Sequence, residues 1–328
     1  MAYDKPFKTY QQQIRHLIDD YGLIINDTVF AEHALKTMSY YDLINGYQDV
    51  MMKNGRYRAN ISIEFLYTFH LFDKGFQNII FSRIMFIENY FKSLLSHCIA
   101  ENFGVHQSNY LDKRNYNYAS KKVVFADVKR DIEKVYKQTY PPIPTRFYQQ
   151  NHNHIPPWIL FKNISFSSSI NLFRVLKSPQ RNTIANELIP DMTILQSEKI
   201  DFIIAGLNLI RKCRNLIAHN LKFVTFRGNS KDTLKKSTLI SLLPQDLTVT
   251  DQSYLRLGNN DLYAVFLFIY HILNTPYLRY LFIEDIIRYI TPPTDGNVAL
   301  FDQYADITRL PHDLLDRCVK IISITPPS

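Results

Sequence analysis

The chain has 328 residues, a length typical of about two domains. Hydrophobic residues make up 46% of it and charged residues 21%, as in globular proteins, so intrinsic disorder and fibrous classes are excluded. With 38 basic and 30 acidic side chains the net charge is +8, which favours a polyanionic partner such as nucleic acid. The Gly-rich phosphate-binding patterns G-x-G-x-x-G and G-x-x-x-x-G-K-[ST] do not occur, which excludes the commonest nucleotide-binding motifs.

Cysteine usage and hydropathy indicate the compartment. Cys98, Cys213 and Cys318 are odd in number and far apart, so the sequence predicts neither a disulfide framework nor a zinc ribbon. The first residues lack the apolar core and small-residue cleavage site of a signal peptide. No run of about 18 uninterrupted apolar residues occurs, so we expect no membrane span and no membrane partner. These features predict a protein of the reducing cytoplasm.

Helical periodicity dominates the chain, strand signals are weak, and the predicted fold class is all-α. Ser62 and Ser197 are placed to cap two long helices, and Asn26-Asp27 to cap a shorter one. A bend is expected near residues 73–75, because about forty residues is long for one globular helix. The predicted helices span about residues 5–21, 28–43, 62–103, 121–138, 167–177, 180–189, 197–223, 260–274 and 277–290, with a tail helix starting near residue 312.

Two segments interrupt the helical pattern. Residues 140–157 carry five prolines, so they are predicted to form a loop. Residues 224–258 mix Thr, Gly, Lys and Leu and could form a small hairpin. We divide the chain into an N-terminal helical segment at 1–61, a helical core at 62–225 and a C-terminal helical extension at 226–328.

The segment 201–220, DFIIAGLNLIRKCRNLIAHN, places one charge inside an apolar stripe. At 100° per residue Arg214 falls in the middle of that stripe, and an unpaired buried guanidinium needs a partner anion or a functional role. Asn215 and His219 lie at i and i+4 and share a neighbouring face. The stripe itself consists of Ile203, Leu207, Ile210, Ile217 and Leu221.

A second charge, Glu88, interrupts the apolar stripe of the other long helix, SRIMFIENYFKSLL. Two long helices thus each carry one buried-facing charge, and the two charges have opposite sign. We therefore expect these helices to pack together, with Glu88 facing Arg214 or His219. A purely structural interpretation, an ion pair beside a satisfied core histidine, stays open at this point. The stripe around Glu88 consists of Ile84, Ile87, Phe91 and Leu95.

The pattern Arg214-Asn215-x-x-x-His219-Asn220 on a long helix resembles the R-N-x-x-x-H signature of HEPN-domain ribonucleases. The wider chain resembles the bacterial abortive-infection (Abi) proteins of the AbiD/AbiF-like group over roughly residues 5–225. Segments that resemble this group follow in order along the chain, although Ser168 stands where the group usually has glycine. They are an opening helix at 4–22, a tyrosine-rich turn at 40–47, the helix 65–73, the stretch 84–93, and 154–158 with 165–167.

The resemblance implies a HEPN-like bundle of long helices and a catalytic group made of Arg214, Asn215 and His219, supported by Glu88 and Asn220. Such residues can cleave RNA without a metal or a cofactor. His219 would exchange protons with the ribose 2′-OH and the leaving 5′-oxygen, and Arg214 would stabilise the charged phosphorane. Asn215 would orient the histidine or hold a phosphate oxygen. The expected products are 2′,3′-cyclic phosphate and 5′-hydroxyl ends.

The resemblance also implies partners. HEPN ribonucleases generally pair two domains so that two such motifs face each other, and this chain has one convincing motif, so a homodimer is expected. An unrestrained ribonuclease would poison its host, which implies control by a partner, and a small regulatory RNA is one candidate. The basic residues that follow His219 could grip the backbone of an RNA substrate. They are Lys222, Arg227, Lys231, Lys235 and Lys236.

Two other functions stay open. The chain could be a non-catalytic HEPN-like module that binds RNA or protein, or it could be a metal-dependent nuclease. His152 and His154 could offer two metal ligands, yet no cysteine or carboxylate pair stands at ligand spacing, so we interpret them as loop histidines and expect no metal. Cys213 is interpreted as a packing residue because no base is placed to activate it.

Overall fold

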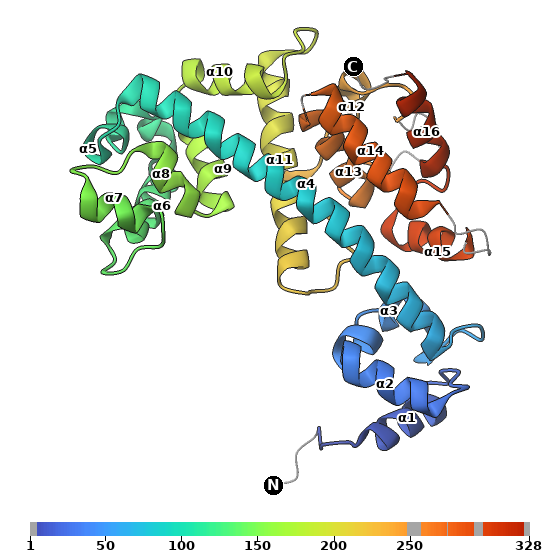
Figure 1. The fold of residues 1–328 in the computed structure, drawn as a ribbon. Coiled ribbons are helices and arrows are strands. Elements are labelled where there is room, and N and C mark those ends of the chain that lie inside the picture. The colour runs from blue at the N-terminus through green and yellow to red at the C-terminus, as the bar shows by residue number, and fades with distance from the viewer. Residues whose placement is uncertain (1–4, 248–256, 274, 292–297, 325–328) are drawn as a thin grey trace.

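The computed structural model describes residues 5–247, 257–273, 275–291 and 298–324, and helices make up its architecture (Figure 1). The predicted all-α class is confirmed. Among the described residues the strands are β1 (Met52–Lys53) and β2 (Arg56–Tyr57), an antiparallel pair. The α-helices are α1 (Tyr10–Asp19), α2 (Thr28–Met38), α3 (Gln48–Met51), α4 (Ile63–Phe103), α5 (Gln107–Tyr110), α6 (Tyr118–Lys137), α7 (Thr145–Asn151), α8 (Pro157–Asn163), α9 (Phe166–Val175), α10 (Ser178–Leu188), α11 (Gln196–Ala218), α12 (Lys236–Leu242), α13 (Leu262–Ile272), α14 (Pro276–Ile290), α15 (Val298–Thr308) and α16 (Leu314–Ile324).

Helix α4 is the long axis on which other helices pack (Figure 1). The Ser62 hydroxyl accepts a hydrogen bond from the Phe65 N–H and caps its start, as predicted. The helix is continuous over 41 residues, without a break at 73–75, where the sequence predicts a bend. Gly75 serves close packing instead, because a Cβ at this position would overlap the ring of Tyr289 in α14.

The apolar seam of α11 is buried where the helix lies against its neighbours and opens towards its end. Ile203, Leu207 and Ile210 are fully buried, so the predicted stripe is confirmed over these turns. Ile217 is only partly buried, and the side chain of Leu221 is 47% exposed. The last turn of α11 therefore lies at the surface of the protein, and the residues that it carries are partly or fully exposed to solvent.

The ends of α11 differ from the prediction. The helix begins at Gln196 after Leu195, which makes no side-chain capping bond, so the predicted cap by Ser197 is wrong. It ends at Ala218 and not near residue 223, because Asn220 adopts a left-handed backbone conformation with a φ of +51°. Asparagine tolerates this conformation better than most residues, and a helix cannot continue through it.

Helix α2 also ends earlier than predicted. Asp27 caps its start by accepting hydrogen bonds from the Val29 and Phe30 N–H groups, as predicted. The helix stops at Met38 because Ser39 has a φ of +60°. A single π-helical turn, η1 (Tyr41–Asn45), then leads into α3 and brings this segment against α4.

The two predicted interruptions have different outcomes. The Pro-rich segment 140–157 is only partly a loop, because it contains α7. The predicted hairpin at 224–258 is wrong over residues 224–247, which hold the short helices η3 (Ser230–Asp232) and α12, whereas 248–256 lie outside the described residues. Two backbone N–H groups of this segment bond to another loop and not across a hairpin. Gly228 and Leu234 donate their N–H groups to the carbonyls of Asn260 and Asn259 at 2.6 and 2.8 Å.

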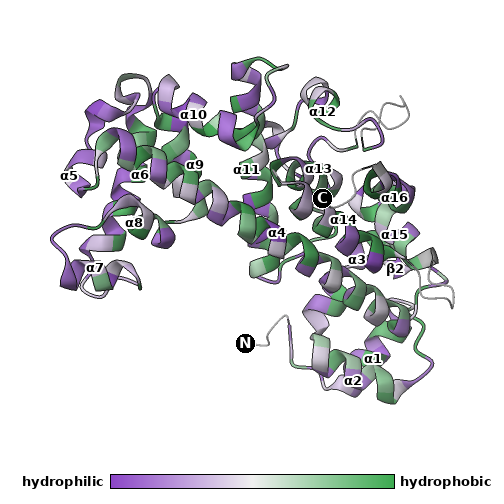
Figure 2. Cartoon of the chain, turned by 45° about the horizontal axis from the view of Figure 1, so that its top comes forward, coloured by the Kyte–Doolittle hydropathy of each residue, from purple (hydrophilic) through white to green (hydrophobic). Residues whose placement is uncertain are grey.

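The C-terminal helices pack beside the middle of α4 (Figure 1). Every residue of α13 is buried. Helix α14 starts at Pro276, one residue before the predicted start, and α15 has no counterpart in the predicted helices. Hydrophobic residues gather along α4 and the helices packed on it, while α5 and α7 are mainly hydrophilic (Figure 2). Among the described residues, no helix combines the length and hydropathy needed to cross a bilayer.

Replacing Gly206 with alanine should lower the free energy of unfolding. Helix propensity alone would favour alanine by about 1 kcal/mol. The added methyl group would overlap the Phe268 ring of α13, however, and overpacking costs about 1–3 kcal/mol. Urea unfolding should therefore show a net loss. Adding Phe268→Leu should make the double variant more stable than the sum of the single changes, and simple additivity would contradict the contact.

Candidate functional site

Arg214 lies near the end of α11, where this helix crosses α4. Its Nη2 donates to Glu88 Oε2 at 3.1 Å, so the predicted contact between the two helices is confirmed. Its Nη1 donates to Asn215 Oδ1 at 3.1 Å. The side chain of Arg214 is 28% exposed, so one side of the guanidinium meets the core and the other faces solvent.

Glu88 is shared between two cations. Its side chain is 7% exposed, and Oε1 pairs with Lys92 Nζ at 2.8 Å while Oε2 receives Arg214. One negative charge and two positive charges leave the cluster with an excess of one positive charge. This arrangement suits an anion such as a phosphate, because the carboxylate fixes the cations without neutralising both. Lys92 is absent from the predicted site, although its i+4 spacing from Glu88 could have indicated it.

His219 follows α11 as its C-cap residue and is exposed. Its backbone N–H donates to Asn215 O at 3.1 Å, but in the described part of the chain its imidazole makes no hydrogen bond. Asn215 uses its side-chain oxygen for Arg214 and not for the histidine. The imidazole is therefore accessible to a ligand from solvent, which a satisfied core histidine would not be.

The residues after His219 are bound to the N-terminal segment. Asn220 accepts a hydrogen bond from Lys74 Nζ at 2.5 Å and donates one to Asp42 Oδ2 at 3.0 Å. Lys222 pairs with Asp49 at 2.5 Å. Two elements, α4 and the segment around η1, thus hold the turn that carries His219 in place.

A buried hydrogen-bonded cluster lies beneath this turn. Asp73 accepts from the hydroxyls of Tyr47 and Tyr304 at 3.0 and 2.9 Å and from Gln77 at 2.8 Å. Tyr47 also bonds to His70 Nδ1 at 2.9 Å. Burial raises the pKa of Asp73, and the three donors oppose this effect because they stabilise the carboxylate.

The cluster joins two of the sequence segments that resemble the Abi group, because Tyr47 ends the tyrosine-rich turn and Asp73 ends the helix 65–73. A small cavity of about 50 Å³ separates it from the turn after His219, and Asp73, Lys74 and Asn220 all line this cavity. Sequence patterns did not predict this connection. A charge at Asp73 between the buried Phe69 and Phe76 could have indicated it.

The predicted basic run is not brought together at His219. Arg227 donates to the backbone carbonyls of Phe226 and Ile307 at 2.6 and 3.0 Å, and burial lowers its pKa. Lys235 pairs at 3.5 Å with Asp201. Asp201 precedes Arg214 by thirteen positions on α11, which is about 20 Å along the helix.

The other residues of the run also have separate environments. Lys222 is the one that lies beside the turn, and it is paired with Asp49. Lys231 is exposed near α11, and the buried Lys236 Nζ has no partner among the described residues. The segment after residue 222 therefore runs back along α11, away from His219.

No group of three or more His, Cys, Asp or Glu side chains that could hold a metal ion occurs within the described ranges. His154 Nδ1 bonds to Asn153 Oδ1 at 2.7 Å, so this loop histidine has a local partner. Cys213 is fully buried, and burial raises its pKa above the usual range for a thiol, as expected for a packing residue.

A protein-family model described as Abi-like protein matches residues 33–224. This range contains Tyr47, Asp73, Glu88, Arg214 and His219, and it ends before the C-terminal helices. Neither the search of curated proteins nor the search of solved structures found a match.

Glu88→Gln should destabilise the fold much more than His219→Ala. The substitution removes the carboxylate shared by Arg214 and Lys92 and leaves two adjacent cations, at a cost of about 3 kcal/mol or more. Truncating the exposed, unbonded His219 should cost less than about 0.5 kcal/mol. Chemical unfolding followed by circular dichroism measures both. The matched control is Glu101→Gln, an exposed glutamate of the same helix, and equal costs at the two glutamates would contradict the shared carboxylate.

Proposed function

The chain belongs to the Abi-like protein family, and we propose that it is a metal-independent endoribonuclease of the HEPN type that acts in phage defence by abortive infection. The family suggests the biological role. The observation that supports the chemistry is one arrangement at the end of α11. A guanidinium held by a buried carboxylate lies within a few residues of an exposed imidazole that makes no hydrogen bond to the described residues.

The proposed reaction is an attack by the ribose 2′-oxygen on the adjacent phosphorus. A neutral His219 takes the proton of the 2′-OH while the new P–O2′ bond forms. Arg214, with Lys92 behind Glu88, stabilises the additional negative charge on the phosphorane oxygens. Asn215 keeps Arg214 oriented through the 3.1 Å hydrogen bond. The P–O5′ bond then breaks, and the products are a 2′,3′-cyclic phosphate and a 5′-hydroxyl.

Protonation of the leaving 5′-oxygen needs a second acid, and the site offers one histidine. We therefore propose that two copies of the chain pair at this face and that the second His219 supplies the proton. Two apolar side chains beside the turn support a covered surface, because Tyr41 and Leu221 are 68% and 47% exposed and border the same small cavity. Such exposed apolar groups are typical of interaction sites when they cluster.

Abortive infection requires that the activity be restrained until a phage enters. We propose that a small structured RNA or another partner binds the chain and blocks the site before infection. The net charge of +8 is compatible with a polyanionic inhibitor as well as with an RNA substrate.

The second candidate function is a non-catalytic RNA- or protein-binding module. It is favoured by the Arg214–Glu88 pair, because a salt bridge between two packed helices already gives Arg214 a structural role. This function leaves the exposed and unbonded His219 without a role. A cleavage assay distinguishes the two candidates.

His219→Ala should reduce RNA cleavage by at least about 100-fold, the usual contribution of one general acid–base group. The measurement uses end-labelled RNA in the presence of EDTA and identifies cyclic-phosphate ends. His97→Ala, a substitution of another exposed histidine, is the matched control and should retain full activity. Binding of RNA without cleavage by the intact chain would favour the module, and loss of cleavage in EDTA would favour a metal-dependent nuclease.

Specific activity should fall when the protein is diluted, because the composite site dissociates into single chains. Cleavage rates per chain are measured over a dilution series, with light scattering at matched concentrations to report mass. His97→Ala should follow the same curve as the parent. A chain that is monomeric and keeps its full specific activity would rule out the composite site, although Arg214 and His219 could still act.

A further inference from the structure

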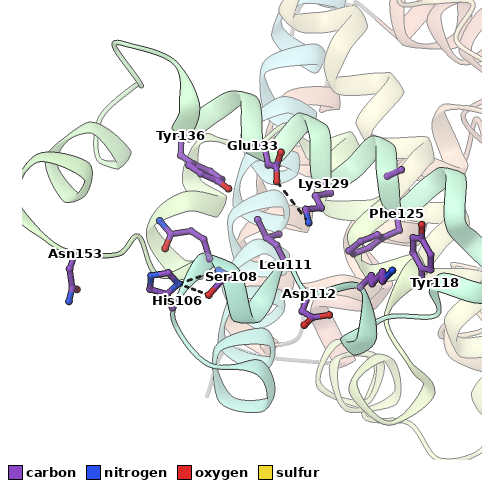
Figure 3. A pocket seen from close by; sticks show the side chains of 13 residues that line it. His106, Ser108, Leu111, Asp112, Tyr118, Phe125, Lys129, Glu133, Tyr136 and Asn153 are labelled. Carbon is purple, nitrogen blue, oxygen red and sulfur yellow. Dashed lines mark hydrogen bonds and ion pairs between the residues drawn. The ribbon is translucent and has the colours of Figure 1, made fainter.

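A large cavity lies away from the candidate catalytic residues, between α6 and the segment of α5 and η2 (Lys113–Asn115) (Figure 3). Its volume is about 930 Å³, within the range of ligand pockets in proteins. Phe125, Lys129, Glu133 and Tyr136 reach into it from α6, and Ser108, Leu111 and Asp112 face them (Figure 3). No step of the proposed cleavage uses this cavity.

The two carboxylates of the cavity wall each have a close cationic partner outside the wall. Asp112 is bound by Arg114, whose Nε and Nη2 lie 2.9 and 2.5 Å from Oδ2, and this contact lowers the pKa of Asp112 to about 2. Glu133 accepts a hydrogen bond from Lys137 at 2.8 Å. The cavity therefore does not repel an anion, as two unpaired carboxylates would.

Two ammonium groups of the wall have no close carboxylate partner of their own. Lys129 makes a long ion pair of 4.0 Å with Glu133, a carboxylate that it shares with the closer Lys137, and Lys113 lies over the Tyr118 ring at 5.4 Å. Within the described ranges Lys113 has no carboxylate partner. The wall thus presents a positive charge at each of two positions, and such charges attract the negatively charged phosphodiester groups of a nucleic acid.

The remaining wall residues are of types that bind a nucleobase. The ring of Tyr136 is half-buried and offers a surface for stacking. The Oε1 atom of Gln107 is buried and receives no hydrogen bond from the described residues, although such acceptors are usually satisfied. An amino group on the edge of a base would satisfy it. Asn153 adds an amide from the loop that also carries His152 and His154.

From this wall we infer that the cavity binds a nucleotide, with its base on Tyr136 and its phosphate at Lys113 and Lys129, and that single-stranded RNA is the source of that nucleotide. The choice of RNA rests on the proposed function. The cavity then holds one part of an RNA while another part reaches the end of α11. A free nucleotide shares the same chemistry, and the experiment separates the two sources.

The test measures binding in the His219→Ala background, so that no RNA is cleaved. Fluorescence anisotropy with a short fluorescein-labelled single-stranded RNA gives Kd and its salt dependence. Lys113→Ala with Lys129→Ala should raise Kd at least about tenfold and reduce the slope of log Kd against log salt by about 1.4, which corresponds to two lost phosphate contacts. The control combines Lys122→Ala with Lys134→Ala, an equal charge change on α6 outside the cavity, and should change both values much less.

Tyrosine substitutions test the stacking. Tyr136→Ala should raise Kd at least about fivefold, whereas Tyr136→Phe keeps the ring and should bind as the parent does. Melting temperatures close to that of the parent show that each variant is folded. Competition with 5′-AMP separates the two sources. Complete displacement of the RNA by 5′-AMP identifies a free nucleotide as the ligand, and incomplete displacement identifies the RNA strand.

Equal affinities of the cavity variants and the control variants would overturn the inference, and so would no binding of either RNA or 5′-AMP. These results are separate from those of the cleavage assay. RNA that binds through the cavity but is not cut by the intact chain rejects the endoribonuclease and keeps this site. If the intact chain cuts RNA but the cavity substitutions leave Kd unchanged, the nucleotide site is rejected and the endoribonuclease is kept.

Discussion

The carboxylate of Glu88 is the interaction on which the rest of the candidate site depends. It is buried where the two longest described helices, α4 and α11, cross, and it is satisfied by Lys92 from its own helix and Arg214 from the other. A buried carboxylate that has two cationic partners can be desolvated, because each of its oxygens keeps an ion pair. The same pairing fixes the guanidinium at the surface with a positive charge left over. The packing of the two helices and the position of the candidate catalytic guanidinium therefore both depend on the Glu88 carboxylate.

A second constraint acts on the other side of His219. Asp73 gathers hydrogen bonds from the N-terminal segment through Tyr47 and from α15 through Tyr304. Next to it, Lys74 and Asp42 hold Asn220. The histidine thus lies between two residues that are held in place, Arg214 on the helix and Asn220 in the turn, while its own ring makes no hydrogen bond to the part of the chain that the structure describes. A group that must contact a substrate benefits from a rigid backbone and an accessible side chain.

Periodicity was enough to predict the helices that form the crossing, because α4 and α11 are long and carry continuous apolar stripes. It was also enough to predict that Glu88 faces the end of α11, since Glu88 and Arg214 are each a lone charge within such a stripe, but the choice between Arg214 and His219 as its partner needed the structure. The ends of α2 and α11 could not be predicted in this way, because Ser39 and Asn220 adopt positive φ values that depend on tertiary contacts and not on local pattern. The convergence of Tyr47, Asp73 and Tyr304 spans most of the chain, and no spacing rule relates such distant positions.

The placement of Lys231 and Lys235 shows a related limit. These residues follow His219 closely in sequence, but the chain reverses at Asn220 and carries them back along α11. Proximity in sequence after a helix end therefore does not indicate proximity in space. The residues that do surround the candidate site, Lys74 and Lys92, come from α4, which precedes it by more than a hundred positions.

The packing of α13 has a consequence for how the chain can be divided. The Phe268 ring occupies the space above Gly206, and Tyr304 completes the bonds of Asp73, yet both residues lie beyond the range 33–224 that matches the family model. A fragment cut to that range would expose the apolar seam of α11 to water and deprive a buried carboxylate of one donor. The described residues of the last third of the chain thus belong to the same hydrophobic core, and the borders of a sequence family need not coincide with the borders of that core.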